Sequence, residues 1–249
     1  MPVMDEFKEE RAAVKDGTLK QKLTYFFDYY KWHVICGVIA VIFAGVLIYQ
    51  LTTQKDAAFY AMLLNGTSRS YPAESGHRDA FAEYAGIDTS EYDVIYDTSV
   101  QIGTGAGDDY QSAQTLMIHI TAADLDVMVS DLDSLRHYAY LGDFRDLRDI
   151  LTEEQLNRYE DSFYYIDMTV ANAIENAKRE YDYDYTPVYG DPLRPEDMQD
   201  PVPVGILLPE DCSLLEDYVF PDKAAPAVSV LINAEHTGAA LQFIDFLMQ

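Results

Sequence analysis

Basic residues and cysteines are scarce in this sequence, and both shortages restrict what the protein can bind. Of its 249 residues, 17 are lysine or arginine and 43 are aspartate or glutamate, so the formal net charge is −26. Such an acidic chain repels nucleic acid, and we expect no nucleic-acid partner. Of the two cysteines, Cys36 lies in a long apolar run and Cys212 stands alone outside it, which predicts a fold without a disulfide.

Motifs for catalysis and for metal binding are also missing. The five histidines show no H-E-x-x-H or other metal-ligand spacing, and neither G-x-S-x-G nor S-x-x-K occurs. The glycine-rich segment 103–109, "GTGAGDD", lacks the lysine of a phosphate-binding loop, and Asp108 replaces the third glycine of a dinucleotide-binding pattern. We therefore expect no metal, no cofactor and no enzymatic activity.

One long apolar run is present, from Val34 to Tyr49, "VICGVIAVIFAGVLIY". Together with its neighbours it predicts a transmembrane helix over 33–51, because about 18 residues at about 1.5 Å each nearly cross a bilayer core of roughly 30 Å. Trp32 and Tyr49 stand where aromatic side chains settle at the interface. The preceding aromatic segment 23–33, "LTYFFDYYKWH", is either an interfacial belt or the first turns of a longer helix.

The charges beside this run predict its orientation. Lys20, Lys22 and Lys31 precede the run closely, and this excess of basic residues places 1–32 in the cytoplasm and at the interface. The run begins after more than thirty residues and no A-x-A-like cleavage site follows it, so we expect an anchor and not a removed signal peptide. Residues 52–249 are then extracellular, and they hold 11 of the basic and 37 of the acidic residues.

The predicted extracellular domain alternates between apolar strands and helical patterns. Such alternation favours an α/β fold with a mainly parallel sheet. Asn-Gly follows the first strand as a turn signal, and Gly86 ends the first helix as a C-cap would. The predicted strands are 57–66, 92–100, 125–129, 202–209 and 226–234, the predicted helices include 75–86, 110–122 and 237–249, and 162–181 is predicted as a strand followed by a helix.

Six aspartates lie between Asp124 and Leu147, around the apolar strand 125–129. Ser130 and Asp133 have the S-x-x-D spacing of a helix-capping box. The aspartates are therefore interpreted as residues that begin and end elements. A calcium loop is disfavoured because Met128 interrupts the ligand pattern. Further caps are predicted at Thr152 with Gln155, at Asp108 or Asp109, and at Thr237.

Small polar residues follow two of the predicted strands. In open α/β sheets, ligands bind beyond the carboxyl ends of the strands, near helix N-termini. This rule predicts a small-molecule site whose residues, after the first and third strands, are Asn65, Gly66, Thr67, Ser130, Asp131 and Asp133. The alternative is that they are only turn and cap residues.

Two segments of the chain resemble the extracellular solute-binding proteins that serve ABC importers. "TAADLDVMVSDLDSLRHYAYLGDFRDL" follows that family's order of helix end, strand, short helix and corner. "VSVLINAEHTGAALQFIDFL" is similar to its C-terminal strand and helix, with His236, Ala240, Phe243 and Leu247 at matching places. Because only 198 residues follow the apolar run, the resemblance implies one lobe of such a protein, carried on a transmembrane helix.

These observations predict a single-pass membrane protein whose outer domain acts by binding a small ligand or a membrane or surface protein. Two alternatives remain open. The domain is a structural or assembly component of the envelope without a ligand, or it is a surface hydrolase. The last requires a pair among Asp126, Asp131 and Asp133 with carboxyl groups about 5–9.5 Å apart.

Overall fold

The computed structural model describes residues 18–53, 55–70, 76–105, 109–221 and 225–249, with side chains described in the first range for 18–20 and 32–49. The chain divides into two compact units, 1–54 and 55–249. Residues 1–17 of the predicted cytoplasmic segment lie outside the described residues. Each unit is considered by itself.

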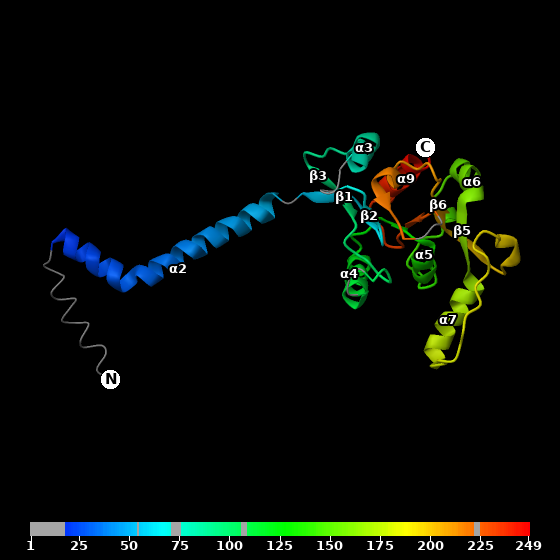
Figure 1. The fold of residues 1–249 in the computed structure, drawn as a ribbon, viewed down its shortest axis with the longest axis horizontal. Coiled ribbons are helices and arrows are strands. Elements are labelled where there is room, and N and C mark those ends of the chain that lie inside the picture. The colour runs from blue at the N-terminus through cyan, green and yellow to red at the C-terminus, as the bar shows by residue number, and fades with distance from the viewer. Residues whose placement is uncertain (1–17, 54, 71–75, 106–108, 222–224) are drawn as a thin grey trace. The chain divides into compact units, whose positions relative to one another are not determined.

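In the first unit, the residues that the structure describes form a helix of 35 residues, α2 (Leu19–Thr53). It includes the aromatic segment 23–33, so this segment forms the first turns of a longer helix. The apolar stretch Trp32–Tyr49 is exposed along its length. Within the described part of the chain, α2 is the one helix that is long and apolar enough to cross a membrane (Figure 1).

The second unit is built on a six-stranded sheet in the order β3-β1-β4-β8-β6-β5. β1 pairs in parallel with β3 and β4, whereas the β4–β8, β8–β6 and β6–β5 pairs are antiparallel. Most strands therefore run in one direction, with β8 and β5 reversed, and the predicted α/β class is confirmed. The strands are β1 (Asp56–Leu63), β3 (Tyr92–Asp97), β4 (Val127–Ser130), β5 (Phe163–Asp167), β6 (Pro201–Leu207) and β8 (Ala227–Val230).

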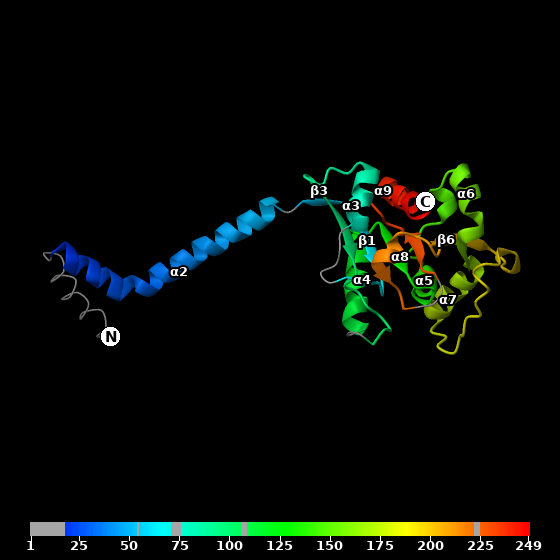
Figure 2. The same cartoon turned by 45° about the horizontal axis from the view of Figure 1, so that its top comes forward.

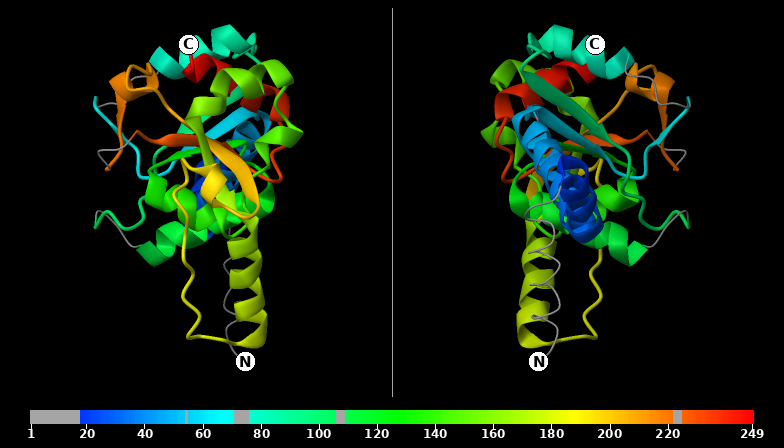
Figure 3. Two further views of the ribbon diagram at one scale, coloured as in Figure 1. Left: turned by 90° about the vertical axis from the view of Figure 1, so that its right-hand side faces the viewer. Right: turned by 90° about the vertical axis from the view of Figure 1, so that its left-hand side faces the viewer.

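Helices cover both faces of this sheet. Figures 1 and 2 show α3, α6 and α9 on one face and α4 and α5 on the other. Figure 3 shows α7 projecting away from the sheet together with the loop that returns from it. The remaining elements are α3 (Gly76–Ala85), α4 (Asp109–Ala122), α5 (Leu132–Ala139), α6 (Glu153–Tyr159), α7 (Met168–Glu180), α8 (Leu214–Asp217), α9 (Thr237–Leu247), the 3₁₀ turns Leu147–Asp149, Glu160–Ser162 and Pro195–Asp197, and a small sheet of β2 (Thr67–Ser68) and β7 (Tyr218–Val219).

Three phenylalanines form the centre of the core on the α3 and α9 face. Phe59 of β1 lies 4.8 Å from Phe81 of α3 and 4.9 Å from Phe243 of α9, measured between ring centroids. All three side chains are fully buried. Truncating one of them to alanine removes about 3–5 kcal/mol of stability in a typical core. The core therefore packs α3 and α9 side by side onto β1.

Helix caps show where the predicted termini were right and where they were wrong. Thr152 and Gln155 form the predicted capping box of α6. At α5 the cap is Asp131, whose carboxylate accepts a hydrogen bond from the Ser134 amide at 2.9 Å. The prediction for Ser130 was therefore one residue early, because D-x-x-S and S-x-x-D overlap here.

Two further predicted caps need comment. The N-cap of α9 is His236, and Thr237, predicted for this role, is the first helical residue. Asp109 is the first residue of α4, while Asp108 lies outside the described residues. Gly86 has φ +68° directly after α3, as predicted for a C-cap glycine.

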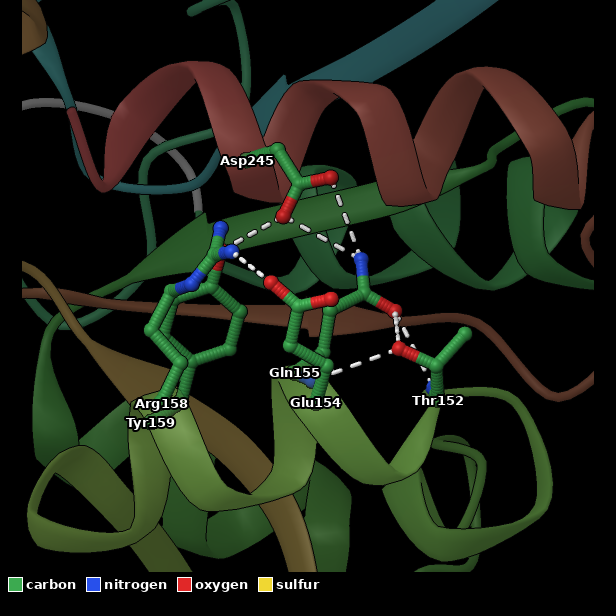
Figure 4. A network of polar contacts seen from close by, with 6 residues as sticks. All are labelled: Thr152, Glu154, Gln155, Arg158, Tyr159 and Asp245. Carbon is green, nitrogen blue, oxygen red and sulfur yellow. Dashed lines mark hydrogen bonds and ion pairs between the residues drawn. The ribbon is translucent and has the colours of Figure 1, made fainter.

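A polar network joins α6 to the C-terminal helix α9 (Figure 4). Gln155 accepts from Thr152 through Oε1 and donates through Nε2 to both carboxylate oxygens of Asp245, each at 3.1 Å. The Tyr159 hydroxyl also donates to Asp245, and burial together with this carboxylate raises the pKa of Tyr159 to about 12. The capping box at the start of α6 therefore orients the Gln155 side chain, which in turn bonds to Asp245 of α9.

Candidate functional site

A pocket of about 340 Å³ lies at the carboxyl ends of β1, β3 and β4. The chain leaves β1 for β3 on one side and later returns to β4 on the other side, so the strand order reverses at β1. Open α/β sheets bind ligands at such a point. The pocket is lined by Asn65, Ile102, Gly103, Thr104, Asp131, Asp133, Ser134 and Pro221.

Asn65 is the residue that connects the three strand ends. Its φ of +62° is a left-handed conformation that asparagine tolerates better than most residues. Its side-chain oxygen accepts from the Ile102 amide at 2.7 Å, and its Nδ2 donates to Asp131 at 2.8 Å and to the Ser134 hydroxyl at 3.1 Å. A buried asparagine with all these bonds fixes the loop after β3 against the start of α5.

Asp131 has a fully occupied carboxylate. Oδ1 accepts from the Ser134 amide, and Oδ2 accepts from Asn65 and from the Ser134 hydroxyl, each at 2.8 Å. The residue is buried. The carboxylate therefore lies beside the pocket with both oxygens held by protein donors, so its position is fixed.

The pocket wall carries two carboxylates and no basic side chain among the described lining residues. Asp133 is exposed, and it forms an ion pair at 2.6 Å with Arg136, which lies one turn further along α5. An anion entering the pocket would meet the charges of Asp131 and Asp133 before any cation. The electrostatics favour a neutral polar or a cationic ligand.

The predicted site residues are not all brought together. Asn65, Asp131 and Asp133 line the pocket, whereas Gly66, Thr67 and Ser130 are not among its lining residues. The lining residues are only part of the predicted set, and whether they bind a ligand stays a prediction.

The other three predicted residues, Gly66, Thr67 and Ser130, contribute to the packing of the fold outside the pocket. Gly66 packs closely on Phe220, Thr67 belongs to β2, and Ser130 is fully buried at the end of β4. The Ser130 hydroxyl has no hydrogen-bond partner among the described atoms. A missing side chain at Gly66 is required, because an added Cβ would lie 3.0 Å from the Leu63 carbonyl oxygen.

Sequence reasoning missed the loop after β3. Ile102, Gly103 and Thr104 line the pocket, and the Gly103 amide donates to Asp109 at 3.0 Å. The signal was present, since 92–100 was predicted as a strand and the rule on carboxyl ends applies to every parallel strand. Ser134 was also missed, because the capping box was placed one residue early.

Asp126 lies at the opposite end of β4, where its carboxylate joins β1 to the start of α9. It is buried, and its carboxylate accepts from the backbone amides of Tyr60 at 2.9 Å and His236 at 2.7 Å, and contacts His236 Nδ1 at 3.2 Å. Five residues of extended chain separate it from Asp131, about 16 Å at roughly 3.3 Å per residue. These two acids therefore cannot form the carboxylate pair that a hydrolase needs.

No group of three histidine, cysteine, aspartate or glutamate side chains that could hold a metal occurs among the residues that the structure describes. Comparison of the chain with family models, with curated proteins and with solved structures finds no match.

Proposed function

We propose that this chain is a single-pass membrane protein that presents a solute-binding-like α/β lobe outside the cell and acts by binding, not by catalysis. The observation that carries the proposal is the pocket at the carboxyl ends of β1, β3 and β4, where Asn65 joins the three ends. The apolar stretch of α2 supports the anchor, and the three lysines before it support a cytoplasmic N-terminus.

The chemistry of the pocket supports a small neutral or cationic solute. Asp131 supplies a fixed negative charge, Asp133 a second at the rim, and Thr104 a hydroxyl. Sugars and amines suit such a wall, because their hydroxyl and ammonium groups can donate to the exposed carboxylate of Asp133, and a cation is also attracted by the buried carboxylate of Asp131. Carboxylates and phosphates do not suit it.

Binding is favoured over catalysis by the state of the acids. A general acid or base has to exchange a proton with its substrate, and Asp131 and Asp126 use their oxygens on protein donors. Asp133 alone is accessible. Asp131, the other carboxylate of the pocket wall, accepts hydrogen bonds from Asn65 and Ser134 through both oxygens, which disfavours it as the partner of Asp133 in hydrolysis of a glycoside.

The pocket is shallow on one side, and a single lobe cannot close over a ligand. Tight capture buries most of a small ligand, so a membrane or surface protein or a second copy would have to cover the open side. We therefore expect weak binding by the isolated chain and tighter binding with such a partner.

Calorimetric titration of the full chain in detergent tests this function. Neutral sugars, amines and cationic amino acids are compared with carboxylate and phosphate compounds of similar size. We expect heat of binding from a neutral or cationic solute, and for a cationic solute Asp133→Lys should lower the affinity about fivefold through charge repulsion. Glu180→Lys, which makes the same charge change at an exposed site on α7, serves as the control and should leave the affinity unchanged. Silence with every solute contradicts the proposal.

One observation favours the second candidate function, an assembly component without a ligand. Tyr110, Met117 and Ile118 expose an apolar face on α4, bordered by Ala113 and Ala122. Exposed apolar patches on folded domains mark contact surfaces. If every solute is silent and the chain associates through α4, this candidate replaces the first.

A further inference from the structure

The two edge strands of the sheet, β5 and β3, differ in whether another segment pairs with their outer side. At the β5 edge, the Tyr165 amide donates at 2.9 Å to the carbonyl of Pro192, which lies in the loop returning from α7. At the β3 edge, the backbone of 93–97 pairs only with β1 among the residues that the structure describes. An uncovered strand offers a row of free amides and carbonyls to another chain.

A groove of about 720 Å³ runs along this open edge, between β3 and α3. Its lining is mainly polar and charged, with an apolar part formed by Ala82 of α3, Ile87 and Val94 of β3. An edge strand beside a helix is the arrangement to which an extended peptide adds as a further strand, with backbone hydrogen bonds for affinity and alternate side chains for specificity. The groove therefore has both parts of a peptide site.

The two faces of β3 differ in chemistry. Val94 and Tyr96 face α3 and α9, as the contact of the Tyr96 ring with Phe243 shows, and strand alternation puts Asp93 and Asp97 on the other face. Asp97 is occupied, because it accepts from the Tyr60 hydroxyl at 2.7 Å and from the Ser99 amide. Asp93 is exposed and lines the groove.

The charge of the site selects a basic partner. The groove is lined by three acidic side chains and two basic ones, and one of the basic ones, Arg78, pairs with Asp79 at 3.0 Å, so the acidic charge is in excess. Asp93 and Glu83 add negative charge to a chain whose net charge is already −26. A second copy of this chain would be repelled by the same field, whereas a basic segment is attracted.

We propose that the groove beside β3 binds an extended segment of another protein, which pairs with β3 as an added strand, with apolar side chains toward Ala82 and Ile87 and with lysine or arginine toward Asp93. This surface is separate from the pocket at Asn65, and it needs no small ligand.

Fluorescence anisotropy with the full chain in detergent tests the proposal. The probe is a labelled hexapeptide of alternating lysine and valine, and its control is a peptide of the same composition with three lysines followed by three valines. The alternating peptide should bind about tenfold more tightly, because only it separates the two kinds of side chain onto opposite faces. Binding of both peptides with equal affinity, or of neither up to about 1 mM, overturns the proposal.

Two further measurements separate strand addition from simple attraction of charge. N-methylation of alternate residues of the peptide blocks its amides on one edge only, so one of the two methylated forms should lose binding and the other should keep it. Asp93→Lys should weaken binding about fivefold, and Glu180→Lys should leave it unchanged. Equal loss in both variants overturns the proposal, and so does a dimer of the chain that competes with the peptide, because a second copy would then be the occupant.

Discussion

Two buried aspartates, Asp126 and Asp131, lie at the two ends of β4 and have different roles. Asp126, before the strand, accepts two backbone amides from β1 and from the start of α9. Asp131, after the strand, caps α5 and holds Asn65 beside the pocket. Both are saturated with hydrogen bonds, yet only the second lies where ligands reach a sheet of this kind.

The two acids differ in position, because Asp126 precedes β4 and Asp131 follows it. They are alike in being buried and in accepting hydrogen bonds. Asp126 joins Tyr60, 66 residues before it in the chain, to His236, 110 residues after it. Asp131 bonds to its own helix and to one loop residue. We therefore expect Asp126 to matter for stability and Asp131 to matter for the shape of the pocket, and the predictions below test this division.

The largest effect is expected from Asp126→Ala. The substitution removes the acceptor of the buried Tyr60 amide and of the partly buried His236 amide, which costs about 1–3 kcal/mol for each group. Unfolding by denaturant should show a loss of at least about 3 kcal/mol. Asp126→Asn, which keeps one carbonyl oxygen in place, should recover part of it, and a loss below about 1 kcal/mol for Asp126→Ala would refute the division.

The next effect comes from a third buried polar residue, His77 of α3. Burial lowers its pKa from 6.5 to about 4, with Asp217 opposing the shift, and its Nδ1 lies 3.2 Å from the Tyr96 hydroxyl. Because the folded state prefers the neutral ring, this stability is complete above pH 6.5 and is lost as the pH falls through about 4. The loss between pH 7 and pH 4 is about 3 kcal/mol.

The matched variant for this prediction is His77→Phe, which keeps a ring of similar size. Other carboxylates also titrate in this range, so the measured quantity is the difference between the two proteins in how stability changes with pH. The variant should be about 3 kcal/mol less sensitive to acid. Parallel stability curves from pH 7 to pH 4 would show that His77 is not buried as described.

A smaller effect is expected at the other end of β4. Asp131→Ala removes the cap of α5 and leaves the Asn65 side chain without its acceptor, which should cost about 1–2 kcal/mol. Hydrogen exchange should become faster at the start of α5 and in the loop 100–104. A loss of stability larger than that of Asp126→Ala would reverse the comparison.

The smallest effect belongs to Asp133→Asn. Its ion pair with Arg136 is exposed and separated by three residues, so stability should change by no more than about 0.5 kcal/mol. The same variant should nevertheless weaken a cationic ligand, because it removes charge from the rim of the pocket. Thermal unfolding and calorimetry on one preparation check both expectations.

Much of the fold could be predicted because its signals are local. Strands such as 202–209 and 226–234 are mainly apolar runs because both of their faces are buried. The end of α3 is also visible in the sequence, because Gly86 readily adopts the positive φ found there. Strand direction in β8 and β5 depends on partners far away in the chain, and no local pattern records it.

The site could be predicted only in part for the same reason. The turn after β1 and the cap after β4 carry small polar residues that a sequence shows directly. That Asn65 reaches the Ile102 amide, or that Asp126 meets the start of α9, depends on contacts across 37 and 110 residues. Of the aspartates in 124–147, Asp126 has the bond that spans the longest stretch of chain. The sequence shows only that it lies at the start of a strand, because nothing local indicates its bond to His236.

The central claim is that the carboxyl ends of β1, β3 and β4 form the binding site, and hydrogen exchange of the full chain measures this directly. With a saturating solute selected by calorimetry, amide exchange should slow at Ile102–Thr104 and around Ser134 and stay unchanged along 92–97. Protection confined to 92–97, or no protection anywhere in 55–249, would contradict it.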